Sequence, residues 1–193
     1  MGLFSKFKKN KNNNKSSMDN ALNDFFRLKD TSYTTPPKPN FSHNSSNNSK
    51  EVSDYLNEKL SSKNLTTRDL FAYDALNNQA YTRLAQALQK ELGCGDIKPD
   101  GNCNFEWNTL VNYVMTTVTI RNYYEKTVRV TLGINCRSNN STNAITLLVG
   151  DDKVNIPLDT IPDMESDASF IYENTAKKVK DYLVSKRYNS ITF

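Results

Sequence analysis

The residues with the clearest capacity for chemistry are one cysteine and one histidine. Cys103 follows an Asp-Gly-Asn tripeptide in the run from Pro99 to Phe105. A cysteine thiol becomes a nucleophile only when a base or a positive charge beside it favours the thiolate. The only histidine, His43, lies far from Cys103 in a Ser- and Asn-rich stretch that has nothing to hold a side chain in place. These residues therefore predict no active cysteine enzyme.

The run around Cys103 resembles the nucleophile loop of ovarian-tumour-type cysteine proteases, where Asp-Gly-Asn-Cys-x-Phe opens a helix. The segment Arg-Tyr-Asn-Ser-Ile that begins at Arg187 resembles the histidine strand of that family. The resemblance implies a base at Arg187, and a guanidinium group cannot be deprotonated to act as one. We interpret the cysteine segment as a structural turn, with Gly101 at positive φ and Cys103 as a small buried residue. A degenerate relative of the proteases is the minor alternative.

The spacing of the ligand-type residues gives little support to metal or cofactor chemistry. Cys94, Cys103 and Cys136 form no Cys-x-x-Cys pair that would start a zinc site. The glycine-rich patterns that hold phosphates do not occur. The acidic residues from Asp151 to Asp167 are typical of a hairpin tip and a helix N-terminus. We predict no metal, no cofactor and no enzymatic activity, and sparse cysteines without a secretory signal pattern predict a reducing, intracellular compartment.

The basic charge of the chain is concentrated at its N-terminus. The net charge is +4, and five lysines precede the first acidic residue, Asp19. A nascent helix would gather Leu3, Phe4 and Phe7 on one side, and such a wedge beside lysines suits an anionic membrane, each lysine adding about 1 kcal/mol. The predicted membrane-binding residues are Leu3, Phe4, Lys6, Phe7, Lys8, Lys9, Lys11 and Lys15. An unstructured solubilising tail is the alternative.

Two more segments of the first fifty residues have a distinct character. Residues 18–28 are an amphipathic island, typical of a segment that docks on a partner or on its own domain; a nascent helix without a partner is the alternative. The predicted docking residues are Met18, Leu22, Phe25, Phe26 and Leu28. The linker that follows contains Pro36, Pro37 and Pro39, which favour polyproline-II geometry. We therefore predict that residues 1–50 form a disordered basic arm and linker.

Residues 51–193 have the pattern of a single α+β domain. Apolar spacing predicts a helix over 50–60 and a longer one over 67–92. Thr66 and Asp69 resemble a capping box at the start of the second helix, and Gly93 suits its left-handed end.

The hydrophobic period changes from 3.6 to 2 after Trp107, which predicts strands. The strict alternation indicates an antiparallel β-meander of about four strands with one buried face. The apolar positions lie within 114–120, 128–134, 145–149 and 154–158. Ser166 is the predicted cap of a last helix that runs to about Tyr188. Helices on both sides of the meander in sequence should cover its apolar face.

Basic residues lie beside aromatic ones around the predicted turn before residue 128. The set is Arg121, Tyr123, Tyr124, Lys126 and Arg129, which could stack on and pair with nucleic acid. A solvated hairpin end is the commoner explanation of such a set. Lysines of the last helix would extend the basic surface.

A basic N-terminus, a proline-containing linker and one compact α+β domain together resemble a rhabdovirus-type matrix protein. The resemblance implies a viral structural protein on the cytoplasmic face of host membranes and in the virion. Such a protein binds anionic membrane, forms homo-oligomers and links the membrane to ribonucleoprotein or RNA. The family's proline-rich late motif corresponds to Pro36-Pro37-Lys38-Pro39, which lacks the tyrosine of Pro-Pro-x-Tyr. A capsid or nucleocapsid protein that packages nucleic acid with its lysine arm is the alternative.

Overall fold

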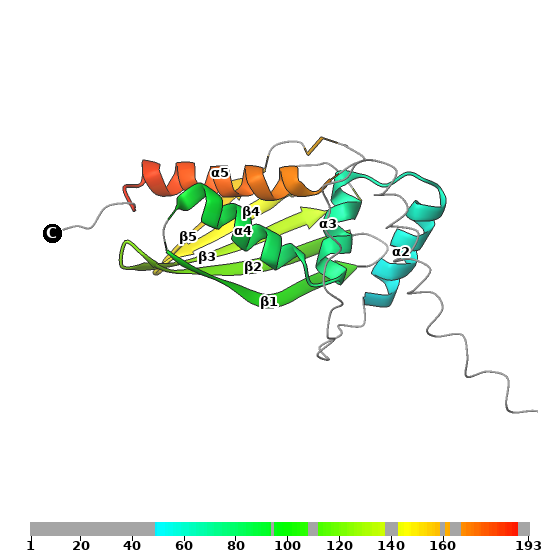
Figure 1. Cartoon of the computed structure of the whole chain (residues 1–193), viewed down its shortest axis with the longest axis horizontal. Coiled ribbons are helices and arrows are strands. Elements are labelled where there is room, and N and C mark those ends of the chain that lie inside the picture. Colours follow the sequence, from blue (N-terminus) through cyan, green and yellow to red (C-terminus); the bar gives the residue numbers. More distant parts are fainter. Residues whose placement is uncertain are drawn as a thin grey trace, which may run out of the picture.

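The computed structural model describes residues 49–93, 95–107, 112–137, 143–158, 161–162 and 167–188. These residues form two layers: a five-stranded antiparallel sheet and a layer of helices over one of its faces (Figure 1). The predicted α+β class, with a meander covered by helices, is confirmed. No helix in the described ranges has the length and apolar character needed to cross a membrane.

The helices before the sheet differ from the prediction at one point. Helix α2 spans Ser49–Ser61, as expected, but the expected long helix is two, α3 (Thr67–Leu76) and α4 (Ala80–Leu92). The break lies at 77–79, where Asn78 has a φ of 57° and so adopts the left-handed conformation that ends a helix. The asparagine pair at this point is a stop signal that the apolar spacing of residues 67–92 concealed.

Both predicted helix ends have the expected chemistry. The N–H of Asp69 donates to Thr66 Oγ1 at 3.3 Å, and the N–H of Thr66 donates to Asp69 Oδ2 at 2.9 Å, which is a capping box. Gly93 ends α4 with a φ of 65°, a conformation that glycine adopts without a steric penalty.

The sheet is a simple meander with its strands in sequence order. Its strands are β1 (Asp96–Trp107), β2 (Asn112–Tyr123), β3 (Lys126–Asn135), β4 (Ala144–Val149) and β5 (Asp152–Pro157). The prediction included the last four and missed β1. Strand β1 contains Pro99 and Gly101, and its pairing with β2 shifts between Pro99 and Cys103. This irregularity interrupts the alternation that reveals a strand in sequence, so the interpretation of the segment as a turn was wrong.

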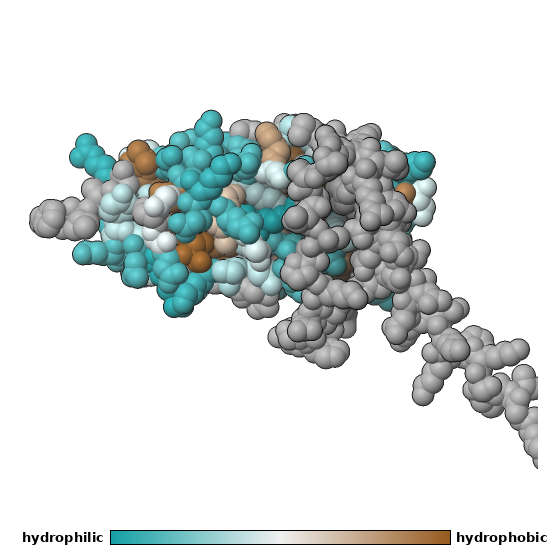
Figure 2. All heavy atoms as spheres, viewed as in Figure 1, coloured by the Kyte–Doolittle hydropathy of each residue, from teal (hydrophilic) through white to brown (hydrophobic). Residues whose placement is uncertain are grey.

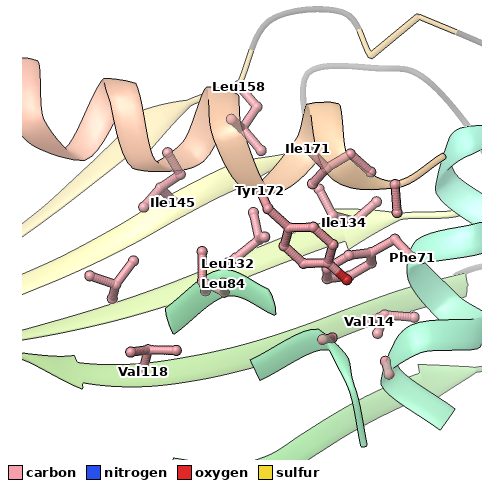
Figure 3. Packing of buried hydrophobic residues seen from close by; sticks show 14 of the residues in the cluster. Phe71, Leu84, Val114, Val118, Leu132, Ile134, Ile145, Leu158, Ile171 and Tyr172 are labelled. Carbon is pink, nitrogen blue, oxygen red and sulfur yellow. The ribbon is translucent and has the colours of Figure 1, made fainter. Parts of the chain in front are cut away.

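The core lies between the helices and the sheet. Val114, Val118 and Ile120 point inward from β2, and neighbouring residues on the opposite side of the strand remain partly exposed. Figure 3 shows Val114 and Val118 facing Phe71, Leu84 and Tyr172 of the helices. The largest fully buried side chains are Phe71, Leu56, Leu84, Leu88, Ile120, Leu132, Ile134, Ile145, Leu147, Ile161, Ile171 and Leu183.

The last helix, α5 (Ser169–Ser185), lies beside α4 on the sheet. It begins at Ser169, whose N–H donates to Asp167 Oδ1 at 2.9 Å; the predicted cap, Ser166, lies outside the described residues. Two ion pairs join the helices: Lys180 Nζ to Glu91 Oε1 at 3.0 Å, and Lys90 Nζ to Glu173 Oε1 at 3.6 Å. Because these pairs are well exposed, each contributes at most about 1 kcal/mol, and the apolar interface holds the two helices together.

The opposite face of the sheet is lined by hydroxyl and amide groups. The hydroxyls of Thr117 and Thr131 lie 3.1 Å apart on β2 and β3, and Thr146 Oγ1 donates to Asn155 Oδ1 at 2.8 Å. The paired strands place these four residues in one row across the sheet. These polar side chains therefore hydrogen-bond to one another across neighbouring strands, on the face of the sheet that the helices do not cover.

Candidate functional site

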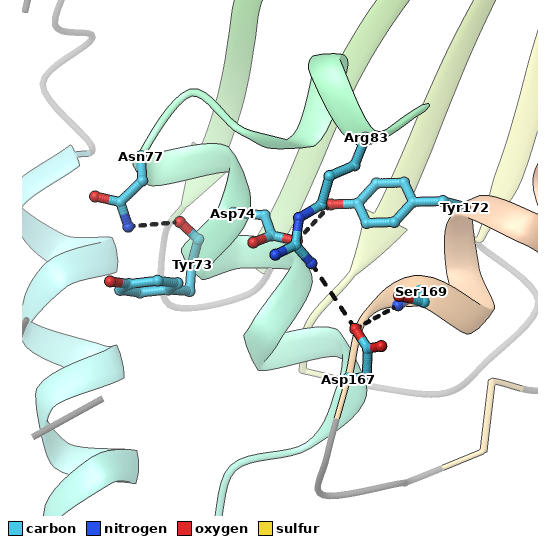
Figure 4. Close-up of polar contacts among 7 residues, drawn as sticks. All are labelled: Tyr73, Asp74, Asn77, Arg83, Asp167, Ser169 and Tyr172. Atoms are coloured by element: carbon cyan, nitrogen blue, oxygen red, sulfur yellow. Dashed lines mark hydrogen bonds and ion pairs between the residues drawn. The ribbon is translucent and has the colours of Figure 1, made fainter. Parts of the chain in front are cut away.

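A buried polar cluster lies where α3, α4 and α5 meet (Figure 4). Asp74 accepts a hydrogen bond from the Tyr172 hydroxyl at 2.8 Å, and its Oδ2 lies 3.2 Å from Arg83 Nη1. The same guanidinium nitrogen lies 3.8 Å from Asp167 Oδ1, just before α5. We call Asp74, Arg83, Asp167 and Tyr172 the helix junction. Its bonds connect three helices that are separated in sequence.

Asp74, at the centre of the helix junction, has an unusually high pKa for a carboxyl group. Asp74 is 6% exposed, and burial raises its pKa to about 6, although Arg83 and the Tyr172 hydroxyl both favour the charged form. Burial also raises the pKa of Tyr172 well above its usual value, as does the neighbouring Asp74. A near-neutral pKa is what a general acid or base requires. Here the carboxylate is enclosed by its own partners, so the arrangement serves to fix the helices.

A second polar group joins α2, α3 and β1. The Tyr55 hydroxyl donates to Asp69 Oδ1 at 2.7 Å, so Asp69 serves both this tyrosine and the capping box. The Tyr55 ring meets the Trp107 ring edge-on, with 5.1 Å between centroids. Burial and the Asp69 charge raise the pKa of Tyr55, which keeps the hydroxyl protonated as a donor. The Tyr55 contacts therefore attach α2 to α3 and to β1.

Cys103 lies in β1 and not at the start of a helix. Its Sγ is 3.6 Å from Thr116 Oγ1 of β2, and burial raises the pKa of the thiol to about 11. A thiol with such a pKa is almost wholly protonated at neutral pH, the opposite of an activated nucleophile. Arg187, at the position of the family's base, follows α5 with a φ of 57°. The two segments of the protease resemblance therefore meet no requirement for thiol activation.

The other described cysteine also has a packing role. Cys136 is buried, and its Sγ lies 3.4 Å from the carbonyl oxygen of Arg68, to which it donates. Burial raises the pKa of this thiol as well. Across the described part of the chain, no three His, Cys, Asp or Glu side chains gather as a metal site would require. Cys94 lies outside the described residues.

Of the set predicted near residue 128, Tyr123, Tyr124 and Lys126 lie at the tip of the β2–β3 hairpin and Arg121 lies just before it. Arg129 lies further along β3, opposite Thr119. The two-residue turn is Tyr124-Glu125, with φ values of 47° and 66°, and Asn122 just before it has a φ of 55°. Two positive φ values in a two-residue turn are typical of the type I′ turn, which usually holds Asn-Gly. Tyr124 is 37% exposed, one of two large apolar side chains this exposed among the described residues. In the sequence, the aromatic and basic residues marked this hairpin, whereas Tyr124-Glu125 gave no indication of the turn type.

The C-terminal part of α5 brings more positive charge to the same end of the molecule. Residues 177–187 contain five basic residues and one acidic one, Asp181. The Tyr188 hydroxyl donates to Asp152 Oδ2 at 2.8 Å, which places the end of α5 at the β4–β5 turn. Val128 pairs with Val149, so the β2–β3 and β4–β5 turns lie at one end of the sheet (Figure 1).

The structure leaves the predicted arm untested. The membrane-binding set from Leu3 to Lys15, the docking set from Met18 to Leu28 and the prolines Pro36, Pro37 and Pro39 lie outside the described residues. The helix junction was not predicted, although a signal existed. Asp74 lies four residues after Leu70, so a charged residue interrupts the apolar face of α3.

Comparison with known proteins gives no relative. No protein-family model matches the chain, and no curated protein or solved structure is significantly similar to it. Any functional conclusion therefore depends on the residues themselves.

Proposed function

We propose that this chain is a non-enzymatic, matrix-like structural protein. Its N-terminal arm binds an anionic membrane, it self-associates, and it links the membrane to ribonucleoprotein. The observation that carries the proposal is the order of residues 1–15, where Leu3, Phe4 and Phe7 accompany five lysines before any acid. An apolar wedge with lysines gains from acyl burial and from the negative surface potential together.

The polar and thiol groups inside the domain are compatible with a structural role. Buried Asp69 and Asp74 join helices through hydrogen bonds, and burial raises the pKa of both described thiols. A two-layer body with exposed basic residues at one end suits a protein whose work is to hold a position on a charged surface. Figure 2 shows mostly hydrophilic residues on the face that carries α4 and α5, with isolated hydrophobic ones.

Self-association is assigned to the segment 18–28. A helix over this segment would place Met18, Leu22, Phe25 and Phe26 on one face, and the polar sequence around them offers few apolar side chains to pack against. The double substitution Phe25→Ser/Phe26→Ser should reduce the mass measured by sedimentation to that of the monomer. An unchanged oligomer would remove this segment from the proposal.

Packaging of nucleic acid is the second candidate, and a specific observation favours it. Tyr124 is 37% exposed at the tip of the β2–β3 hairpin, near Arg121 and Lys126, and an aromatic ring beside basic side chains is a feature of surfaces that bind single-stranded nucleic acid. Against it, the arm has no arginine among its first fifteen residues and carries the wedge, which phosphate binding does not need.

Vesicle co-flotation separates the two candidates. The full chain and a chain lacking residues 1–17 are mixed with neutral or phosphatidylserine-rich vesicles over a salt series, and the same proteins are tested for RNA retention. We expect flotation of the full chain alone, on anionic vesicles alone, with binding that weakens as salt rises. Equal flotation of both proteins would remove the arm from the membrane proposal. RNA retention without flotation of either protein would replace the membrane proposal with packaging.

A further inference from the structure

We infer that the end of the domain formed by the β2–β3 turn and the end of α5 is a second contact for an anionic lipid surface, separate from the N-terminal arm. We call this surface the hairpin end and define it by Arg121, Tyr124, Lys126, Lys186 and Arg187. The inference rests on the proposed function, because it assumes that the arm brings the domain to a membrane.

Geometry joins the two parts of the hairpin end. Neighbouring strands lie about 4.8 Å apart, so the β2–β3 and β4–β5 turns are separated by roughly 10 Å. The Tyr188–Asp152 hydrogen bond of 2.8 Å fixes the end of α5 to the second turn. Lys186 and Arg187 directly precede that tyrosine and are exposed, as is Arg121 on β2. Basic side chains from two distant segments therefore reach the same end of the molecule (Figure 1).

The β2–β3 turn places a tyrosine in a backbone conformation that is unfavourable for residues other than glycine. Tyr124 and Glu125 hold left-handed φ values of 47° and 66°, which non-glycine residues adopt at a steric cost. The turn thereby keeps a tyrosine 37% exposed at its tip, and Lys126 Nζ lies 3.5 Å from the carbonyl oxygen of Tyr124. Strained backbone of this kind gathers where a side chain is held for function. An amphipathic ring flanked by cations suits the headgroup region of a bilayer.

A lipid surface fits these residues better than nucleic acid does. Tyr123, the other aromatic at the tip, is only 3% exposed, so the β2–β3 turn offers one accessible ring and no platform for successive bases. The basic side chains are also spread over the β2–β3 hairpin and the end of α5, which suits a broad anionic plane, while the β4–β5 turn at the same end carries Asp151 and Asp152.

The test uses four full-length proteins on phosphatidylserine vesicles. They are the unchanged chain, an arm variant (Lys6→Gln/Lys8→Gln/Lys9→Gln), a hairpin-end variant (Arg121→Gln/Lys126→Gln) and a control variant (Lys50→Gln/Lys59→Gln). The hairpin-end and control variants each lose two charges, from one exposed and one half-buried residue, and α2 lies at the opposite end of the domain (Figure 1). Circular dichroism and thermal unfolding verify that each variant is folded.

We expect the hairpin-end variant to partition about thirtyfold more weakly than the unchanged chain, from about 1 kcal/mol per basic residue at the surface, and the control variant to change little. The substitution Tyr124→Trp adds a direct readout by tryptophan fluorescence. The native Trp107 also emits, so the emission of the unchanged chain is subtracted, and because Trp107 is buried we expect its emission not to change on vesicles. The emission of the Tyr124→Trp variant should shift to the blue on anionic vesicles and remain unchanged on neutral ones.

Equal partition of the hairpin-end and control variants, with weak binding of the arm variant, would overturn the second contact and leave the proposed function standing. No flotation of the unchanged chain would overturn both. RNA retention lost from the hairpin-end variant while flotation is kept would transfer the surface to nucleic acid and overturn the lipid assignment.

Discussion

Some residues of this domain have roles that the sequence predicts, and others have roles that only the folded structure shows. Thr66, Asp69 and Gly93 act as their types and spacing predict, because helix caps are local and depend on few atoms. Asp74 could not be assigned in the same way. Its partners, Arg83 and Tyr172, come from other helices, and the Tyr172 contact spans 98 positions in sequence. Only the packing of the helices brings the helix junction together.

The raised pKa of Asp74 predicts a definite pH dependence. Asp74 has a pKa of about 6 in the folded state and an ordinary pKa of 3.8 in the unfolded state, so the folded state binds more protons between these two pH values. The contribution of Asp74 to stability is therefore greatest at low pH and is lost as the pH rises through 6. Relative to Asp74→Asn, the unchanged protein should gain about 2 kcal/mol of unfolding free energy between pH 7 and pH 4.

Urea unfolding of both proteins at several pH values measures this difference. Arg83 and Asp167 face Asp74, so Asp167→Asn, whose partly exposed carboxylate lies 3.8 Å from the same guanidinium, is the matched control. A gap between the unchanged protein and Asp74→Asn that stays constant with pH would contradict the assigned protonation.

The turn residue Glu125 predicts a gain in stability from one substitution. Its φ of 66° is costly for a residue with a Cβ and free of that cost for glycine. Glu125→Gly should raise the free energy of unfolding by about 1 kcal/mol, measured by chemical denaturation. Thr127→Gly, in the regular part of β3, is the comparison and should lower stability; a loss in Glu125→Gly as well would mean that the turn is not strained.

At the scale of elements, sequence patterns predicted the regular strands and failed at the irregular one. Most residues of β2 to β5 alternate between buried and more exposed positions, so the pattern recurs along each strand. β1 contains a proline and a register shift, so its pairing with β2 depends on tertiary context. Likewise the long apolar spacing of residues 67–92 is compatible with one helix or two, and the break at Asn78 decides between them.

The location of Cys103 in β1 predicts an unreactive thiol. Burial favours the protonated form, and Thr116 lies beside the sulfur. In iodoacetamide labelling at pH 7, with sites mapped by mass spectrometry, Cys103 should react at least tenfold more slowly in the folded protein than in urea. Cys136 is the internal comparison because it is buried more deeply. Labelling of Cys103 faster than in the unfolded chain would restore the protease resemblance.

At the scale of the whole molecule, the two-layer domain brings basic residues of the β2–β3 hairpin and of the end of α5 to one end. Patterning predicted the layers because one apolar face per element leaves few ways to cover a meander. It did not predict that the first turn of the sheet and the end of α5 lie together, since that depends on the register of β3 with β4 and on the Tyr188–Asp152 contact. The proposed membrane role depends on the arm, and the hairpin end is the second contact that we infer.

The most direct test of the membrane role compares the full chain with Phe4→Ser/Phe7→Ser on phosphatidylserine vesicles at physiological salt. This variant retains every charge, so it isolates the apolar wedge from electrostatic attraction. We predict that the unchanged chain floats with the vesicles and that the variant remains largely in the soluble fraction. Equal flotation of the two proteins would show that charge alone is responsible, and no flotation of either would contradict the membrane role itself.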